Sequence, residues 1–182
     1  MRNPTDRTIQ KETILKKCFD CLVKTGLEKV SMRDFSKESG LTSSSLYYWF
    51  RDKDEIILDA TDYGINFLIT ELFDYAFKNI ENVEKMCNGF PKMIIKHSAE
   101  LKLMIQMATS PQYGKQTIEM SEKFSVYYDK CANEISSIVN VPYDKIRKLI
   151  DLFVSSVIDC VVWDDWEKLS EEIDLILKLM LH

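Results

Sequence analysis

A run of hydroxyl-bearing and aromatic residues near position 45 is the part of the sequence best suited to binding chemistry. Small hydroxyl side chains are followed there by two phenols, in the order Thr42, Ser43, Ser44, Ser45, Tyr47 and Tyr48. Hydroxyl groups bond to phosphate oxygens and to base edges, and small side chains let a helix approach a groove closely. These residue types predict contact with nucleic acid.

The elements that position this run are two short helices joined by a turn. Ser31 is a good N-cap for the first helix, Gly40 suits the turn, and Thr42 is a good N-cap for the second, which ends near Trp49. A longer helix is expected to begin near Lys53. This arrangement is a helix-turn-helix, whose second helix enters the major groove of DNA.

An amphipathic helix is predicted before this motif, and Thr25-Gly26 should end it. Its apolar stripe consists of Ile14, Leu15, Cys18, Phe19, Leu22 and Val23. Cys18 and Cys21 form a CxxC pair within the helix, and no second pair accompanies it. We interpret the two cysteines as small apolar residues and not as a zinc or redox site, so no metal or cofactor is expected.

The segment from Gly26 to Lys53 resembles the DNA-binding domain of the tetracycline-repressor (TetR) family of bacterial transcriptional regulators. The matching residues are Gly26, Ser39-Gly40-Leu41, Leu46-Tyr47, Phe50 and Lys53. The sequence departs from the family pattern at Ser36, where alanine is usual, and at Ser44, where glycine or another small residue is common. Both changes are small, so they bear on base preference and not on the fold.

The resemblance implies a role for each candidate DNA-binding residue. Base or near-base contacts fall to Arg33, Ser43, Ser44 and Tyr48, and phosphate contacts to Thr42, Tyr47 and Lys53. Alternatives stay open at this point. Arg33 could simply be solvated, and Ser43–Ser45 could serve only as capping and turn residues. Trp49 either packs in the small domain or lies along the sugar-phosphate backbone.

Composition and charge agree with an all-helical protein that has a basic N-terminal part. The chain of 182 residues is 46% hydrophobic and has five glycines and four prolines, with no sustained strand-like alternation. Residues 1–53 carry eleven Lys or Arg against seven Asp or Glu, a net charge of +4, whereas the remainder carries −9. A basic segment of this kind suits binding of a polyanion at one end only. No signal peptide or membrane span is indicated, so a cytoplasmic location is expected.

Two domains are expected, a helix-turn-helix domain in residues 1–53 and a larger helical domain in residues 54–182. The helix from Lys53 could run past Phe77. Breaks at Asn88-Gly89-Phe90-Pro91, Ser110-Pro111 and Val141-Pro142 then predict the remaining helices near 92–109, 113–140, 143–164 and 168–181.

The larger domain is expected to bind a small molecule and to form a homodimer, as in members of the TetR family. The last two helices carry apolar residues on more than one face, which favours a four-helix dimer interface over a deeply buried monomer core. Adaptable Met and aromatic side chains, with one histidine, are candidates for the cavity lining. They are Met86, Phe90, Met93, His97, Met104, Met107, Tyr113, Met120, Phe124, Tyr127, Tyr128 and Trp163.

The function expected is that of a repressor released from a palindromic DNA operator by a small apolar or aromatic molecule. The ligand would change the spacing of the two recognition helices of the dimer, and the helix from Lys53 would transmit that change. No catalytic constellation is found, so an enzyme is not expected. The alternative is a ligand-independent DNA-binding regulator that answers to a partner protein.

Overall fold

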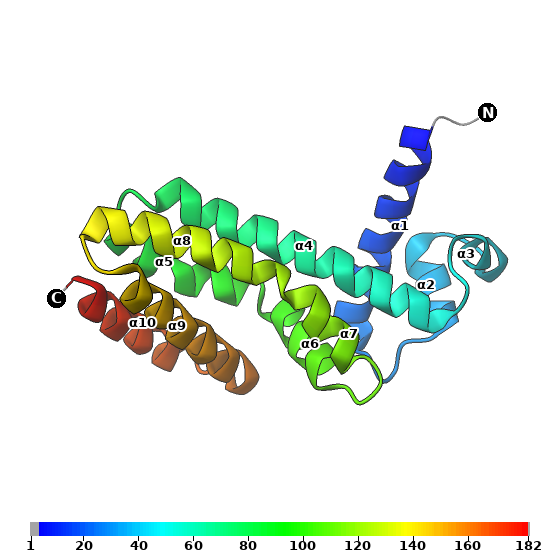
Figure 1. The fold of residues 1–182 in the computed structure, drawn as a ribbon. Helices are drawn as coiled ribbons and strands as arrows, with labels where there is room; N and C mark the ends of the chain where they lie inside the picture. The colour runs from blue at the N-terminus through cyan, green and yellow to red at the C-terminus, as the bar shows by residue number, and fades with distance from the viewer. Residues whose placement is uncertain (1–3, 182) are drawn as a thin grey trace. The chain divides into compact units, whose positions relative to one another are not determined.

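The computed structural model describes residues 4–181, and every regular element in that range is an α-helix (Figure 1). The chain divides into two compact units. The head comprises the residues up to Phe67 together with Leu103–Met120, and the body comprises Leu68–Lys102 together with the residues from Ser121. The all-helical prediction is confirmed. No helix in the described range is long and apolar enough to cross a membrane.

The head contains α1 (Pro4–Thr25), α2 (Met32–Ser39), α3 (Ser43–Trp49) and most of α7 (Gly114–Ser121). It also takes the first part of α4 (Lys53–Asn79) and the end of α6 (Ser98–Thr109). The predicted apolar stripe of α1 contributes to its core. Buried core residues of the head include Cys18, Phe19, Leu22, Phe35, Leu46, Phe50, Ile56, Ile57, Leu103, Met107 and Tyr113.

Side-chain caps set the helix boundaries of the head, as the sequence predicts. The Ser31 backbone N–H donates to Asp34 at 2.8 Å, and the Asp34 N–H donates to the Ser31 hydroxyl at 3.4 Å, which together form a capping box. The Glu55 N–H donates to the Asp52 carboxylate at 2.9 Å at the start of α4. Gly26 has a positive φ of 83° directly after α1, because a residue without a Cβ adopts that conformation at low cost.

The body contains the rest of α4, α5 (Val83–Lys96), α8 (Lys123–Val139), α9 (Tyr143–Trp163) and α10 (Trp166–Leu181). Within it α10 packs against both α9 and α5, and α8 packs against α9. Figure 1 shows α9 and α10 as a neighbouring pair. The helices predicted near 143–164 and 168–181 therefore agree with the structure within a few residues.

One predicted helix break is wrong, because α5 runs through Pro91. Tyr75 of α4 packs against this stretch, and its hydroxyl donates to the Met86 carbonyl at 3.0 Å. A Cβ on Gly89 would meet the Tyr75 hydroxyl oxygen at 1.7 Å, so glycine lets the phenol approach the backbone closely. The helix ends at His97 instead, whose backbone N–H donates to carbonyls of the last turn.

The single helix predicted near 113–140 is also wrong, because the structure divides it into α7 and α8 around Glu122. Most of α7 belongs to the head, whereas α8 belongs to the body. Helical periodicity alone does not reveal this division, since the apolar residues of both segments keep helical spacing.

Candidate nucleic-acid interface

The helix-turn-helix of the head is built on a tight turn between α2 and α3. Gly40 has a φ of 71° there, in the left-handed region that favours glycine. The Ser36 hydroxyl donates to the Leu41 carbonyl, and the Ser39 hydroxyl accepts from the Leu41 N–H at 3.3 Å. Ser36, which departs from the family pattern, therefore contributes a hydrogen bond that an alanine would lack.

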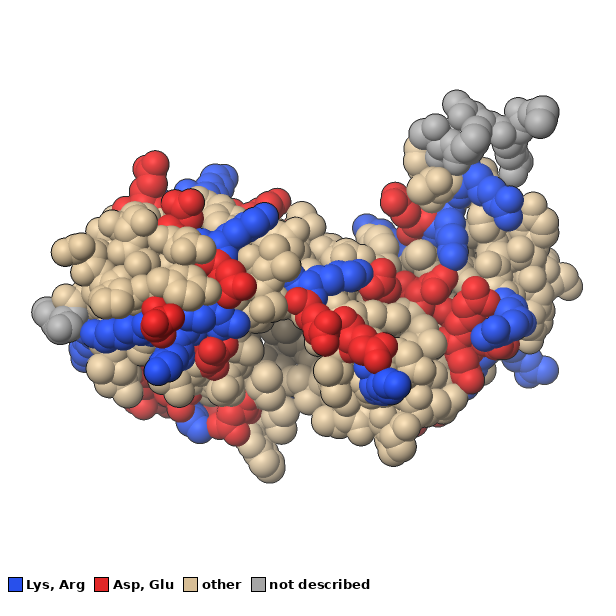
Figure 2. Space-filling view, in the orientation of Figure 1, with Lys and Arg blue, Asp and Glu red and all other residues tan. Residues whose placement is uncertain are grey.

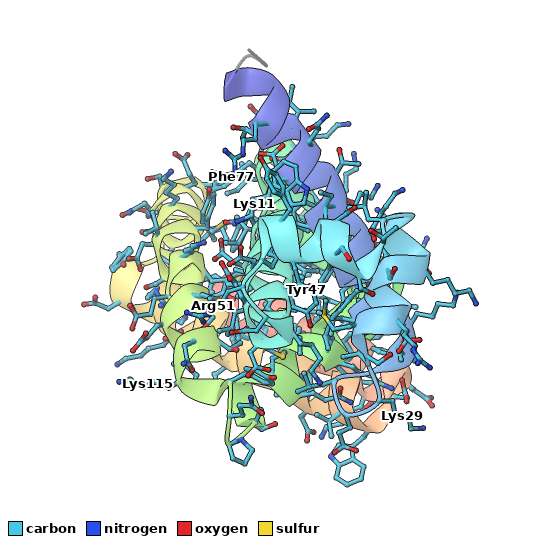
Figure 3. All side chains as sticks on the ribbon, turned by 90° about the vertical axis from the view of Figure 1, so that its right-hand side faces the viewer. Lys11, Lys29, Tyr47, Arg51, Phe77 and Lys115 are labelled. Carbon is cyan, nitrogen blue, oxygen red and sulfur yellow. The ribbon has the colours of Figure 1, made fainter. Side chains whose placement is uncertain are left out.

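Burial fixes the orientation of α3. Leu46 is fully buried in the head core, and Phe50, directly after the helix, is nearly so. Ser44, Tyr47 and Tyr48 are exposed on the other side, with Tyr47 54% and Tyr48 70% exposed. Figure 3 looks onto the side of the head that carries Tyr47. The motif thus presents one hydroxyl and two phenols to solvent on a single helix face.

Two other predicted hydroxyl contacts are engaged in capping α3. The Ser45 N–H donates to the Thr42 hydroxyl oxygen at 3.1 Å, and the two side-chain oxygens are 2.9 Å apart. Ser43 is half-buried. The structure therefore gives Thr42 and Ser45 a capping role, and their DNA contacts stay a prediction.

The predicted cationic contacts, Arg33 and Lys53, have different surroundings. Arg33 is exposed at the start of α2. Lys53 is half-buried, and its ammonium group donates to the Val30 carbonyl at 3.5 Å. Arg51, two residues before Lys53, is exposed and pairs with Asp52 at 2.8 Å. Arg33 and Arg51 are therefore both at the surface, and Arg51 is engaged with a carboxylate.

Arg7 of α1 is a cation that sequence reasoning missed. Its guanidinium carbon lies 5.7 Å from the ring centroid of Tyr48 and 5.5 Å from that of Trp49. The two rings meet edge to face, with centroids 5.6 Å apart. Trp49 is half-buried against the head core, so it packs in the domain and also supports Arg7. Arg7 falls outside the helix-turn-helix motif, and its positive charge was the only signal in the sequence.

Charged side chains lie around α3, but α3 itself carries none. None of its residues, Ser43–Trp49, is ionisable at neutral pH. Figure 2 shows uncharged surface at α3, with both basic and acidic side chains nearby. Among the acidic groups of the motif, Asp34 is engaged in the capping box, and the hydrogen bonds from Ser31 lower its pKa. The positive charge available to a polyanion thus comes from α1 and α2.

The body contains an apolar cavity of about 60 Å³. No nitrogen- or oxygen-bearing side chain lines it. The lining residues are Phe73, Ala76, Met86, Cys87, Phe90, Cys131, Ile135, Ile150, Phe153, Ile173, Ile176 and Met180. Of the predicted ligand-binding residues, only Met86 and Phe90 are among them.

Several of the other predicted ligand-binding residues lie close to the cavity lining or elsewhere in the body. Phe124, Tyr127 and Tyr128 form an aromatic cluster with Phe73, which itself lines the cavity. His97 is buried, and its Nε2 lies 3.3 Å from a carboxylate oxygen of Glu71. Met93 is half-buried outside the lining, and Trp163 is 75% exposed at the end of α9.

The remaining predicted ligand-binding residues belong to the head. Met107 and Tyr113 are buried in its core, Met104 packs against that core, and Met120 is half-buried. The Tyr113 hydroxyl donates to the Asp54 carboxylate at 2.7 Å. The cavity thus involves a smaller and different set of residues than the one predicted.

The segment that contains the helix-turn-helix is similar to a known protein family. Residues 14–60 match the model of the family described as bacterial regulatory proteins, tetR family. That range covers the helix-turn-helix and the first turns of α4. No curated protein matches the sequence.

Solved structures show the same fold over almost the whole chain. A TetR transcription regulator from Haloarcula marismortui is 16% identical, with a TM-score of 0.67 over 95% of this chain and 97% of that one. A transcriptional regulator (TerR/AcrR family) from Aquifex aeolicus is 17% identical, with a TM-score of 0.66 over 94% and 99%. The regulator FadR from Bacillus subtilis, in complex with stearoyl-CoA, is 13% identical, with a TM-score of 0.62 over 94% and 97%.

Proposed function

We propose that this protein is a transcriptional regulator that binds a palindromic operator as a homodimer, because residues 14–60 match the model of the tetR family of bacterial regulatory proteins. We further propose that it is a repressor released from that operator by a small apolar or aromatic molecule. The observation that carries the DNA-binding proposal is the solvent-exposed face of α3, held by a buried Leu46 behind a left-handed turn at Gly40. A helix exposed in this way can enter the major groove of DNA and contact base edges.

Selection of bound duplexes from a randomised DNA pool tests this proposal with the full chain. An inverted repeat whose half-sites lie about 34 Å apart, one helical turn, is expected. Binding should fall steeply with salt, because each phosphate contact releases condensed counterions. A folded protein that enriches no motif would contradict DNA reading.

Arg7 provides a sharper test of how the head binds phosphate. A guanidinium that stacks on rings keeps its in-plane N–H groups available for phosphate oxygens. Arg7→Gln should therefore weaken binding to all sequences and lower the salt slope by about one. Lys24→Gln is the matched control, since it removes one charge at the other end of α1. A salt slope for Arg7→Gln equal to that of the wild type would exclude Arg7 from phosphate binding.

The homodimer proposal rests on the outer surface of α9 and α10. Large apolar residues are exposed on both helices, although their other faces are buried in the body. They are Leu152, Ile158, Val162, Trp163, Leu175, Leu179 and Leu181. An exposed apolar surface on two neighbouring helices suits a symmetric four-helix contact with a second copy.

The effector proposal rests on the apolar cavity of the body. Its lining suits an uncharged part of a ligand, and the similar FadR structure contains stearoyl-CoA. The cavity of about 60 Å³ is small beside the roughly 300–1,000 Å³ of drug-sized sites, so a larger ligand would have to move its walls. Thermal unfolding with straight-chain fatty acids and aromatic compounds tests this. A stabilising compound should lose its effect in Ala76→Leu, which fills the cavity.

The small cavity also supports the second candidate, a regulator controlled by a partner protein. That candidate predicts operator binding that no apolar compound changes. An operator-binding titration with and without each compound distinguishes the two. A compound that both stabilises the protein and lowers operator affinity would favour the effector and exclude the second candidate.

A further inference from the structure

The exposed face of α3 lacks the side chains that make the most specific base contacts. Ser44, Tyr47 and Tyr48 are its exposed residues. Arg or Lys reads guanine, and Asn or Gln reads adenine, through paired hydrogen bonds in the major groove. None of these residue types occurs in Ser43–Trp49. Paired readout of guanine or adenine therefore cannot come from α3.

The hydroxyl groups of this face carry little sequence information. Those of Thr42 and Ser45 are occupied by the cap of α3, at 2.9 Å from each other. Ser44 and the two phenols remain, and each can donate or accept a hydrogen bond. A group that does both fits an acceptor or a donor on a base edge almost equally well. Hydrogen bonding by α3 thus discriminates weakly among the four base pairs.

The aromatic rings of Tyr47 and Tyr48 are the distinctive feature of the face. Tyr48 is already held in place, because Trp49 packs against it edge to face and the Arg7 guanidinium lies 5.7 Å from its centroid. A ring ordered before DNA arrives loses less conformational entropy on binding. The apolar group that a base pair offers in the major groove is the thymine C5-methyl.

We propose that α3 reads its half-site mainly through thymine methyl groups that pack on Tyr47 and Tyr48, so that the base pairs beneath this helix are A·T. Tyr47 then contacts a base, in place of the phosphate contact that the family resemblance implies. The inference rests on the proposed function and names the kind of operator it requires. Positive charge for the phosphates comes from outside α3, from Arg7 of α1. A guanine contact, where the operator has one, is expected at the edge of the half-site that Arg33 reaches.

The test replaces single thymines of the selected operator by deoxyuracil, which keeps the base pair and removes only the methyl group. The full-length protein is titrated against each duplex. Each contacted methyl should contribute about fourfold in affinity, as expected for burial of one methylene-sized group. Because the change is made in the DNA, folding of the protein does not affect the comparison.

Two substitutions of Tyr47 connect the effect to its ring. Tyr47→Ala should abolish the loss caused by deoxyuracil at one position of the half-site, whereas Tyr47→Phe should retain that loss because the ring remains. Lys24→Gln, in the last turn of α1, should respond to deoxyuracil like the wild type. Since Tyr47 is 54% exposed, neither substitution removes a core residue.

The outcomes separate this inference from the proposed function. Deoxyuracil sensitivity within A·T pairs that depends on the Tyr47 ring supports the inference. A selected half-site dominated by G·C pairs, or one insensitive to deoxyuracil, overturns it and leaves operator binding intact. Absence of any selected motif refutes the proposed function and this inference together.

Discussion

Replacing Leu152 by alanine should weaken self-association of the protein while leaving the monomer folded. Leu152 lies on α9 and is 55% exposed. Ile158 and Val162 are exposed further along the same helix, and Leu175 is exposed on α10. If these helices form the dimer contact, the exposed half of the leucine becomes buried only on association.

The magnitude follows from that exposed fraction. Full burial of a leucine side chain contributes about 1.5–3 kcal/mol, so burial of the exposed half contributes roughly 0.8–1.5 kcal/mol. A two-fold symmetric contact contains the residue twice, which gives about 1.6–3 kcal/mol per dimer. Since each 1.4 kcal/mol is a factor of ten, the dissociation constant should rise roughly 15- to 140-fold.

Sedimentation velocity over a range of protein concentrations measures this change. Val126→Ala is the matched control, because Val126 is 56% exposed on α8, outside the two helices concerned. It should leave the dissociation constant unchanged. Equal association of both variants, or a wild-type protein that stays monomeric at micromolar concentration, would refute the assignment of α9 and α10 as the dimer contact.

Three further predictions concern stability. Gly64→Ala should destabilise the protein by about 1–2 kcal/mol in urea, because its Cβ would meet the Phe19 ring at 2.2 Å and this overpacking exceeds the gain in helix propensity. Tyr113→Phe should cost about 1–2 kcal/mol in the same assay, because it removes the hydrogen bond to Asp54. Burial raises the pKa of Tyr128 to about 12, so the folded protein keeps a proton that the unfolded chain releases near pH 10. Stability should therefore fall by roughly 2–3 kcal/mol between pH 10 and 12, and Tyr128→Phe should reduce that fall.

Each of these predictions has an outcome that contradicts it. Adding Phe19→Leu to Gly64→Ala should recover part of the loss, and strictly additive effects would exclude the clash. An unchanged unfolding midpoint in Tyr113→Phe would mean that its hydrogen bond contributes nothing. If Tyr128→Phe unfolds with the same alkaline dependence as the wild type, other groups, such as the buried Cys131 thiol, cause the fall.

The fold and the helix-turn-helix could be predicted because local chemistry determines them. The cap at Ser31, the glycine at position 40 and the apolar stripe of α1 each act within a few residues, so their effect is visible in sequence. Pro91 does not end α5, although proline is a strong local break signal, and the phenol of the distant Tyr75 packs against the same helix. Tertiary contacts of this kind leave no local pattern.

The candidate sites could likewise be predicted where local chemistry determines them and could not where distant contacts do. Tyr47 and Tyr48 are exposed as expected, because α3 buries Leu46 on its opposite side. The cavity could not be predicted, since helical spacing shows that a residue is apolar but not which core it enters. Met107, for example, is apolar at helical spacing but is buried in the head and not at the cavity. Arg7 was missed because its aromatic partners are brought to it only by folding.

The head is discontinuous in the chain, and this restricts how it can be transferred to another protein. Its core includes Leu103, Met107 and Tyr113, which are separated from Phe67 in the sequence by Leu68–Lys102 of the body. A fragment that stops at Phe67 would expose apolar surface to water, and we expect it to aggregate. Chimaeras that exchange operator specificity between regulators of this fold should therefore carry residues 103–120 together with the N-terminal segment, or should exchange only the outer face of α3.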